Sequence, residues 1–200
     1  MNIKKLLLVM PLLFSFATYA RDCATEFENE NYEKAFVECT QEAEENDKVA
    51  QYNLARMYDD GEGIEQDKLK VVYWYTKAAE QGDSTAQNDL AVKYYDGEGI
   101  EQDKLKVSYW FEKAAEQGES FAQYNLALMN YKGDGIDQDK VKAAYWYTKA
   151  AEQNDSEAQY KLGIMYDKGD GVAQDKSLAK KYFKQSCDQG FERACNKLKK

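Results

Sequence analysis

The chain has 200 residues, of which 44% are hydrophobic and 14% aromatic, and it contains a single proline. This composition predicts one folded domain or a short repeat array, and it argues against disorder. The net charge of −9 argues against a nucleic-acid partner and against binding to anionic lipid surfaces.

Residues 1–20 have the features of a signal peptide. Two lysines precede an apolar run over residues 6–16, and Thr18-Tyr19-Ala20 places small residues where signal peptidase cleaves. The run is shorter than the roughly 20 residues that span a membrane, and Asp22 before Cys23 argues against a lipoprotein site. We expect cleavage after Ala20, which removes both lysines and changes the net charge from −9 to −11. No stable membrane insertion is expected after cleavage.

The segment 21–46 follows the predicted cleavage site. A short acidic helix there precedes Asn31-Tyr32-Glu33-Lys34-Ala35-Phe36, which resembles a tetratricopeptide-type hairpin without a long glycine loop. We expect residues 21–46 to form an N-terminal capping hairpin.

A period of 36 residues governs the rest of the chain. The motif that begins with Ala50-Gln51 returns at Ala86, Ala122 and Ala158, with a partial copy at Ala194. Paired glycines, an aspartate and an aromatic residue keep the same step; they are Gly61/Gly63, Gly97/Gly99, Gly133/Gly135 and Gly169/Gly171, then Asp67, Asp103, Asp139 and Asp175, then Trp74, Trp110, Trp146 and Tyr182. The period predicts four stacked units, 47–82, 83–118, 119–154 and 155–190, and a closing helix over 191–200.

Each unit has the pattern of two helices. In 83–118, Ser84 and Gln87 match a capping box at the start of the first helix, a match that recurs at Ser120 and Ser156. Gly97 and Gly99 are expected to end that helix, and Asp103 to cap the second one. Gly118 is expected to terminate the second helix, a role that Asn154 takes in the third unit.

The apolar positions of each unit fall at helical spacing. In the second helix of 83–118 the expected buried residues are Val107, Trp110, Phe111, Ala114 and Ala115. The alanines are small where helices approach closely, and the aromatic residues fill the gaps.

These columns resemble Sel1-like repeats, which are relatives of the tetratricopeptide repeat. The resemblance rests on stretches such as Gly61-Glu62-Gly63-Ile64-Glu65-Gln66-Asp67 and Trp74-Tyr75-Thr76-Lys77-Ala78-Ala79, and it covers about residues 47–200. It implies an all-α, right-handed alpha-alpha superhelix (solenoid) whose first helices line a concave face, and it implies an adaptor or scaffold role in bacteria. Asn130 departs from the pattern, because Tyr58, Tyr94 and Tyr166 stand in the other units; either Tyr131 compensates, or this unit packs differently.

The four cysteines are even in number in a chain expected to be exported, which suggests disulfides. The stretch from Cys187 to Cys195 resembles the disulfide element of Helicobacter cysteine-rich Sel1 proteins, and Cys23 and Cys39 flank a turn at a similar distance. We therefore expect two bridges at the two ends of the array. Two pairs of free thiols, and a zinc site without the usual CxxC spacing or any histidine, are the weaker alternatives.

Little in the sequence indicates catalysis. The chain has no histidine, which excludes Ser-His-Asp and Cys-His mechanisms, and no nucleotide-binding glycine motif. Ser177-Leu178-Ala179-Lys180 matches the S-x-x-K motif of penicillin-recognising enzymes, but Ser-Asp-Asn and Lys-Thr-Gly are missing. The acidic glycine loops lack the spacing of a calcium loop. We expect no enzyme activity, no cofactor and no metal; the alternative is a β-lactam-binding or cell-wall-active hydrolase of the cysteine-rich Sel1 type.

The first helices hold the positions that vary between units. We expect a protein or peptide partner to bind there, and a monomeric protein, in the periplasm or secreted by a bacterium. Tyrosine offers rigid contact area, and asparagine can pair with a partner's backbone. The predicted contact residues are Tyr52, Asn53, Arg56, Asp89, Tyr124, Asn125, Tyr160 and Lys161. An immunity protein against a bacterial toxin is one specific form of this hypothesis, and a solvated helix face without a ligand is its alternative.

Overall fold

The computed structural model describes residues 22–199, and the regular secondary structure of this part is entirely helical. The predicted signal peptide lies outside the described residues. The helices are α1 Cys23–Glu28, α2 Tyr32–Glu44, α3 Lys48–Asp60, α4 Lys68–Glu80, α5 Ser84–Asp96, α6 Lys104–Glu116, α7 Ser120–Lys132, α8 Lys140–Glu152, α9 Ser156–Lys168, α10 Lys176–Asp188 and α11 Glu192–Leu198.

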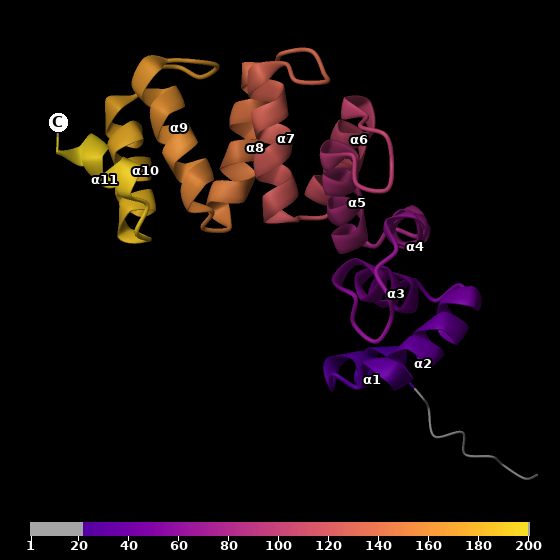
Figure 1. Cartoon of the computed structure of the whole chain (residues 1–200). Coiled ribbons are helices and arrows are strands. Elements are labelled where there is room, and N and C mark those ends of the chain that lie inside the picture. The colour runs from indigo at the N-terminus through magenta and orange to yellow at the C-terminus, as the bar shows by residue number, and fades with distance from the viewer. Residues whose placement is uncertain (1–21, 200) are drawn as a thin grey trace, which may run out of the picture.

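The helices form consecutive hairpins that follow one another along a curved path (Figure 1). The α1–α2 hairpin lies at one end of this path and α11 lies at the other. Each helix packs mainly on its neighbours in sequence. The predicted all-α solenoid is therefore confirmed.

The helix ends follow the sequence pattern, with one correction. Asp67, Asp103 and Asp139 cap the second helices as predicted, and Gly118 and Asn154 adopt the left-handed conformation that ends them. The capping-box prediction is wrong. Asp83 caps α5 by accepting from the Ala86 amide at 2.8 Å, while the Ser84 hydroxyl donates to Glu119 in the next repeat.

The glutamine of the supposed capping box joins neighbouring repeats instead. Gln123 donates from Nε2 to the backbone oxygen of Ala115 at 3.1 Å, and its Oε1 accepts from Gln153 Nε2 at 2.9 Å. The same pair of bonds recurs in each repeat. We call this series the glutamine ladder: Gln51, Gln87, Gln123 and Gln159, which are buried, with Gln81, Gln117, Gln153 and Gln189 thirty residues after them.

The second glycine of each loop fixes the spacing of the stack. Gly99 has a positive φ of 71°, and a Cβ atom there would overlap the carbonyl oxygen of Lys68, at the start of the preceding second helix. Gly63, Gly135 and Gly171 make the same close approach to the preceding hairpin. The loop can therefore pack on its neighbour only while this position lacks a side chain.

The buried stripes agree with the predicted spacing, apart from the aromatic column. Val107, Phe111, Ala114 and Ala115 are buried, but Trp110 is only partly covered and meets the exposed Tyr109 edge-on at 4.8 Å. The Asn130 departure does change local packing. Its side chain is buried and donates to the backbone oxygen of Leu126, so the third repeat has no ring at this position.

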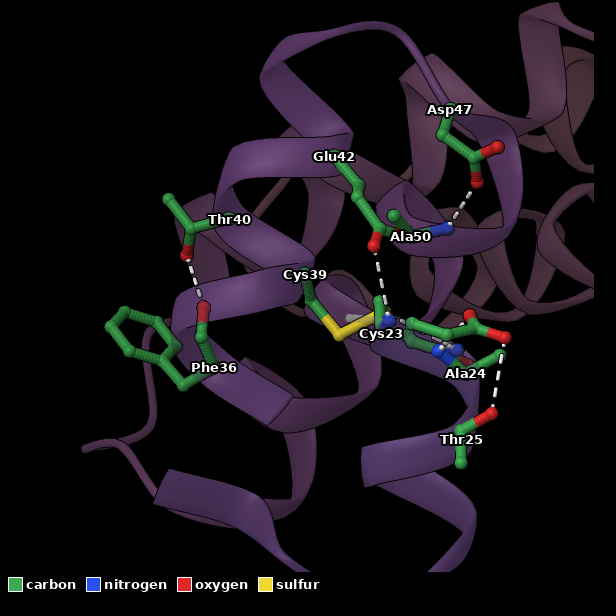
Figure 2. Close-up of a disulfide and its surroundings, with 11 residues drawn as sticks. Cys23, Ala24, Thr25, Phe36, Cys39, Thr40, Glu42, Asp47 and Ala50 are labelled. Atoms are coloured by element: carbon green, nitrogen blue, oxygen red, sulfur yellow. Dashed lines mark hydrogen bonds between the residues drawn. A yellow bond between two sulfur atoms is a disulfide. The ribbon is translucent and has the colours of Figure 1, made fainter. Parts of the chain in front are cut away.

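Both expected disulfides are present (Figure 2 shows the first). Cys23–Cys39 joins α1 to α2, and the Cys23 amide donates to the Glu42 carboxylate at 3.2 Å. Burial raises the pKa of Glu42, although this hydrogen bond opposes the shift. Cys187–Cys195 joins α10 to α11, so each end of the described array has a covalent link.

Candidate functional site

The candidate site is the exposed side of the first helices α3, α5, α7 and α9, here called the first-helix face. It contains the half-buried residues of two columns, which are Tyr52, Asn88, Tyr124 and Tyr160, and Arg56, Val92, Leu128 and Ile164. The structure brings seven of the eight predicted contact residues to this surface. The exception is Asn53, which is 7% exposed and donates to Cys23 Sγ at 3.7 Å, so it supports the disulfide inside the protein.

The three tyrosines pack one edge into the core and leave the other to solvent. The rings of Tyr52 and Tyr124 each lie 5.7 Å from an aromatic ring of the second helix in the same repeat, Tyr75 and Tyr147. Tyr160 lies 5.9 Å from Phe183 and 5.3 Å from Phe191. Because one edge of each ring is fixed in the core, these tyrosines offer preorganised contact area.

A polar cluster occupies the N-terminal part of this face. Asp89 accepts from the Tyr52 hydroxyl at 3.4 Å and from Asn88 Nδ2 at 3.2 Å. Burial raises the pKa of Asp89 despite these bonds, and burial together with the nearby Asp89 raises the pKa of Tyr52 to about 12. Arg56 lies 4.9 Å from the centre of the Phe27 ring and 3.7 Å from Asp60. Both charged groups are thus held in place by contacts within the protein.

An apolar pocket of about 240 Å³ lies between the second and third repeats. Val92 of α5 and Phe121 and Leu128 of α7 line it together with Phe111 of α6. Asn125 also lines it, and its amide group is held by the backbone oxygen of Phe121 at 2.9 Å. Phe121 is 54% exposed, so a large aromatic ring stands at the edge of this pocket.

The composition of the second repeat explains why the pocket lies there. The other three repeats have a tyrosine that packs on the ring of their second helix, whereas the second repeat has the shorter Asn88. Phe111 therefore packs at 6.2 Å against Phe121 of the next repeat, and it lines the pocket. Sequence reasoning identified the variable columns but missed this pocket, and the exchange of tyrosine for Asn88 was the available signal.

The C-terminal part of the face is more basic. Lys161 lines a second pocket of about 380 Å³, between α7, α8, α9 and α11. Lys168 of α9 and Lys197 of α11 line it as well. The first-helix face thus changes in character along the array, from acidic and polar through apolar to basic.

Among the described residues, the S-x-x-K motif is not arranged as a catalytic site. Ser177 and Lys180 are both exposed on α10, and no hydrogen bond joins them in this part of the chain. A serine nucleophile needs a base within hydrogen-bond reach and a site that shields it from water. No group of histidine, cysteine, aspartate or glutamate within residues 22–199 is arranged to hold a metal ion. Every helix in that range is too short or too polar to cross a bilayer.

Family models and solved structures match the chain and agree with each other. The family model described as Sel1 repeat matches residues 48–83, 84–119, 120–155 and 156–191. No curated protein matches the chain by sequence.

Solved structures show the same architecture. The chain is 32% identical to c5321, described as a protective antigen of uropathogenic Escherichia coli, with a TM-score of 0.84; the match covers 88% of this chain but only 39% of that one. A Sel1 repeat protein from Oxalobacter formigenes is 31% identical with a TM-score of 0.83, over 88% of this chain and 72% of that chain. Cysteine rich protein B of Helicobacter pylori is 28% identical with a TM-score of 0.51, over 64% and 91%.

Proposed function

Because the chain belongs to the Sel1 repeat family, whose repeats typically mediate protein–protein interaction, we propose that it is an exported bacterial adaptor. It binds a protein or peptide segment along the first-helix face. The single observation that supports this most is the apolar pocket lined by Phe111 and Phe121. Binding energy in protein interfaces is concentrated in a few side chains that fill such pockets.

The surroundings of the pocket suit a peptide better than a small metabolite. An apolar side chain can enter between Val92 and Leu128, while tyrosines and charged groups extend along the same face on both sides. An elongated ligand can therefore contact several repeats at once, as expected for a stacked array. Export fits the two disulfides, since such bonds persist in oxidising compartments.

Selection from a displayed library of random peptides on the oxidised protein tests the proposal. We expect the selected peptides to share an apolar anchor residue. Phe121→Asp should weaken their binding at least tenfold, because it places a charge at the pocket. Leu105→Asp is the matched control, since Leu105 is 69% exposed on α6 and lies outside the pocket. Equal effects of the two substitutions, or selected peptides without an apolar anchor, would contradict the proposal.

The immunity-protein form of this proposal adds that the partner is a toxin. It predicts that a purified toxin binds to the protein, that Phe121→Asp abolishes this binding, and that Leu105→Asp leaves it unchanged. The alternative hydrolase function predicts covalent labelling by a fluorescent penicillin that is lost in Ser177→Ala. Both residues at the centre of that alternative, Ser177 and Lys180, are exposed.

A further inference from the structure

The second pocket has a donor that the fold does not use. Tyr147 of α8 forms part of its wall and is 1% exposed. Its hydroxyl group has no hydrogen-bond partner among the described residues. Buried polar groups in native proteins are rarely left without a partner.

Packing does not require this hydroxyl group. The equivalent position in the other repeats is Tyr75, Phe111 or Phe183, and two of these three have no hydroxyl. The ring alone therefore suffices to fill the space between the helices. Burial raises the pKa of Tyr147, so the hydroxyl stays protonated at neutral pH and remains a donor.

Three lysines line the same pocket, Lys161 and Lys168 from α9 and Lys197 from α11. Within residues 22–199, no carboxylate lies at ion-pair distance from any of them. Two carboxylates near the pocket have other partners, because Asp170 accepts from Tyr131 at 2.7 Å and Glu157 interacts with Tyr124. Asp167 and Asp170 also attract Lys168, and Asp167 attracts Lys197, but their hydrogen bonds go to Lys176 and to Lys140 and Tyr131. The three lysines of the pocket therefore have no carboxylate bonded to them among the described residues.

The distribution of charge along the chain supports a specific site here. Residues 156–199 contain 9 basic and 6 acidic residues, a net charge of +3, while residues 22–155 contain 14 basic and 30 acidic residues, a net charge of −16. An acidic ligand is repelled by most of this protein and attracted only to its C-terminal quarter. The remaining walls include Ile164 and Met165, which suit the methylene groups of a glutamate side chain.

We propose that this pocket binds the carboxylate of an acidic side chain of the partner that lies along the first-helix face. Tyr147 donates a hydrogen bond to the carboxylate, and Lys161, Lys168 and Lys197 supply the positive charge. This inference rests on the proposed function and adds an orientation to it, with the acidic side chain of the partner toward α9 and its apolar anchor between the second and third repeats.

A defined peptide tests this without knowledge of the natural partner. Fluorescence anisotropy would measure binding of labelled hexaglutamate to the oxidised protein, with labelled hexaglutamine as the reference. We expect hexaglutamate to bind and hexaglutamine not to bind. Lys161→Gln combined with Lys168→Gln should raise the Kd at least tenfold, and Tyr147→Phe should raise it about three- to tenfold by removing one charge-assisted hydrogen bond.

Two controls distinguish binding in this pocket from nonspecific electrostatic attraction to the basic C-terminal part of the protein. Lys181→Gln combined with Lys184→Gln removes the same charge from exposed positions on α10 outside the pocket, and should change the Kd less than twofold. The Tm of Tyr147→Phe should not fall, because the hydroxyl has no partner in the free protein. The proposal is overturned if hexaglutamate does not bind, if both double variants weaken binding equally, or if Tyr147→Phe leaves the Kd unchanged. If hexaglutamate does not bind while Phe121→Asp still weakens the binding of selected peptides at least tenfold, only the acidic site is rejected and the adaptor function stands.

Discussion

Gln123→Ala tests whether the glutamine ladder stabilises the stack. The substitution removes two hydrogen bonds at a residue that is 4% exposed, one to the Ala115 carbonyl oxygen and one from Gln153. Each bond contributes about 1 kcal/mol net, and the lost side-chain volume adds a cavity cost. The remaining groups keep other partners, since Gln153 Nε2 also donates to the Gly118 carbonyl oxygen at 2.8 Å. We therefore expect a loss of about 2–4 kcal/mol.

The assay is urea unfolding of the oxidised protein followed by helical circular dichroism. Gln102→Ala is the matched control, because Gln102 also donates to a backbone oxygen, that of Tyr95 at 2.9 Å, but it is exposed in a loop. The control should lose less than about 1 kcal/mol. If Gln123→Ala costs no more than Gln102→Ala, the ladder accompanies the stacking of repeats without stabilising it, and the reasoning fails.

Three further predictions concern the caps, a buried carboxylate and the loop glycines. Replacing Cys187 and Cys195 by serine should lower the free energy of unfolding by about 2–3 kcal/mol, as the loop-entropy model predicts, and lower the urea midpoint of unfolding. An unchanged midpoint would contradict this prediction. Burial raises the pKa of Asp89 above its ordinary value of 3.8, so stability decreases as pH rises through the folded pKa. Asp89→Asn should therefore raise Tm at pH 7, with a gain that shrinks toward pH 4, and a gain independent of pH would exclude this origin. Gly99→Ala should lower the free energy of unfolding by about 1–3 kcal/mol more than Gly82→Ala, because both glycines have positive φ but only Gly99 contacts the backbone of a neighbouring helix. Equal decreases in Tm would mean that the loop moves to accommodate the added Cβ atom.

Much of the fold could be predicted because its determinants recur in register. Asp103 and Gly97 define helix ends through local backbone chemistry, and the 36-residue step repeats that chemistry in each unit. The capping box failed because Ser84 and Gln87 match a local motif, while the structure offers Gln87 a carbonyl oxygen on the preceding helix. Hydrogen bonds between residues that are eight or thirty positions apart cannot be recognised from a local sequence motif.

The candidate site was less predictable, because it depends on the absence of a side chain at one position and on which side chains are buried. Asn53 looked like its counterpart Asn125, yet the N-terminal disulfide covers it. The pocket at Phe121 follows from the absence of a tyrosine at position 88, which matters only once the helices are stacked. The Tyr147 hydroxyl looks ordinary in a chain with 16 tyrosines until its surroundings are known.

The Cys187–Cys195 bridge has a consequence for how such a chain can change length. Cys195 stands in the column of Gln159, and it contacts a residue eight positions earlier, as Gln159 does through Ala151. A duplicated unit inserted among the inner repeats could form the same glutamine hydrogen bonds with its neighbours as the existing repeats do. A unit appended after α11 would meet two sulfur atoms already bonded to each other. An insertion among the inner repeats would therefore keep the glutamine ladder, whereas a repeat placed after α11 would find a disulfide at the position of one of its hydrogen bonds.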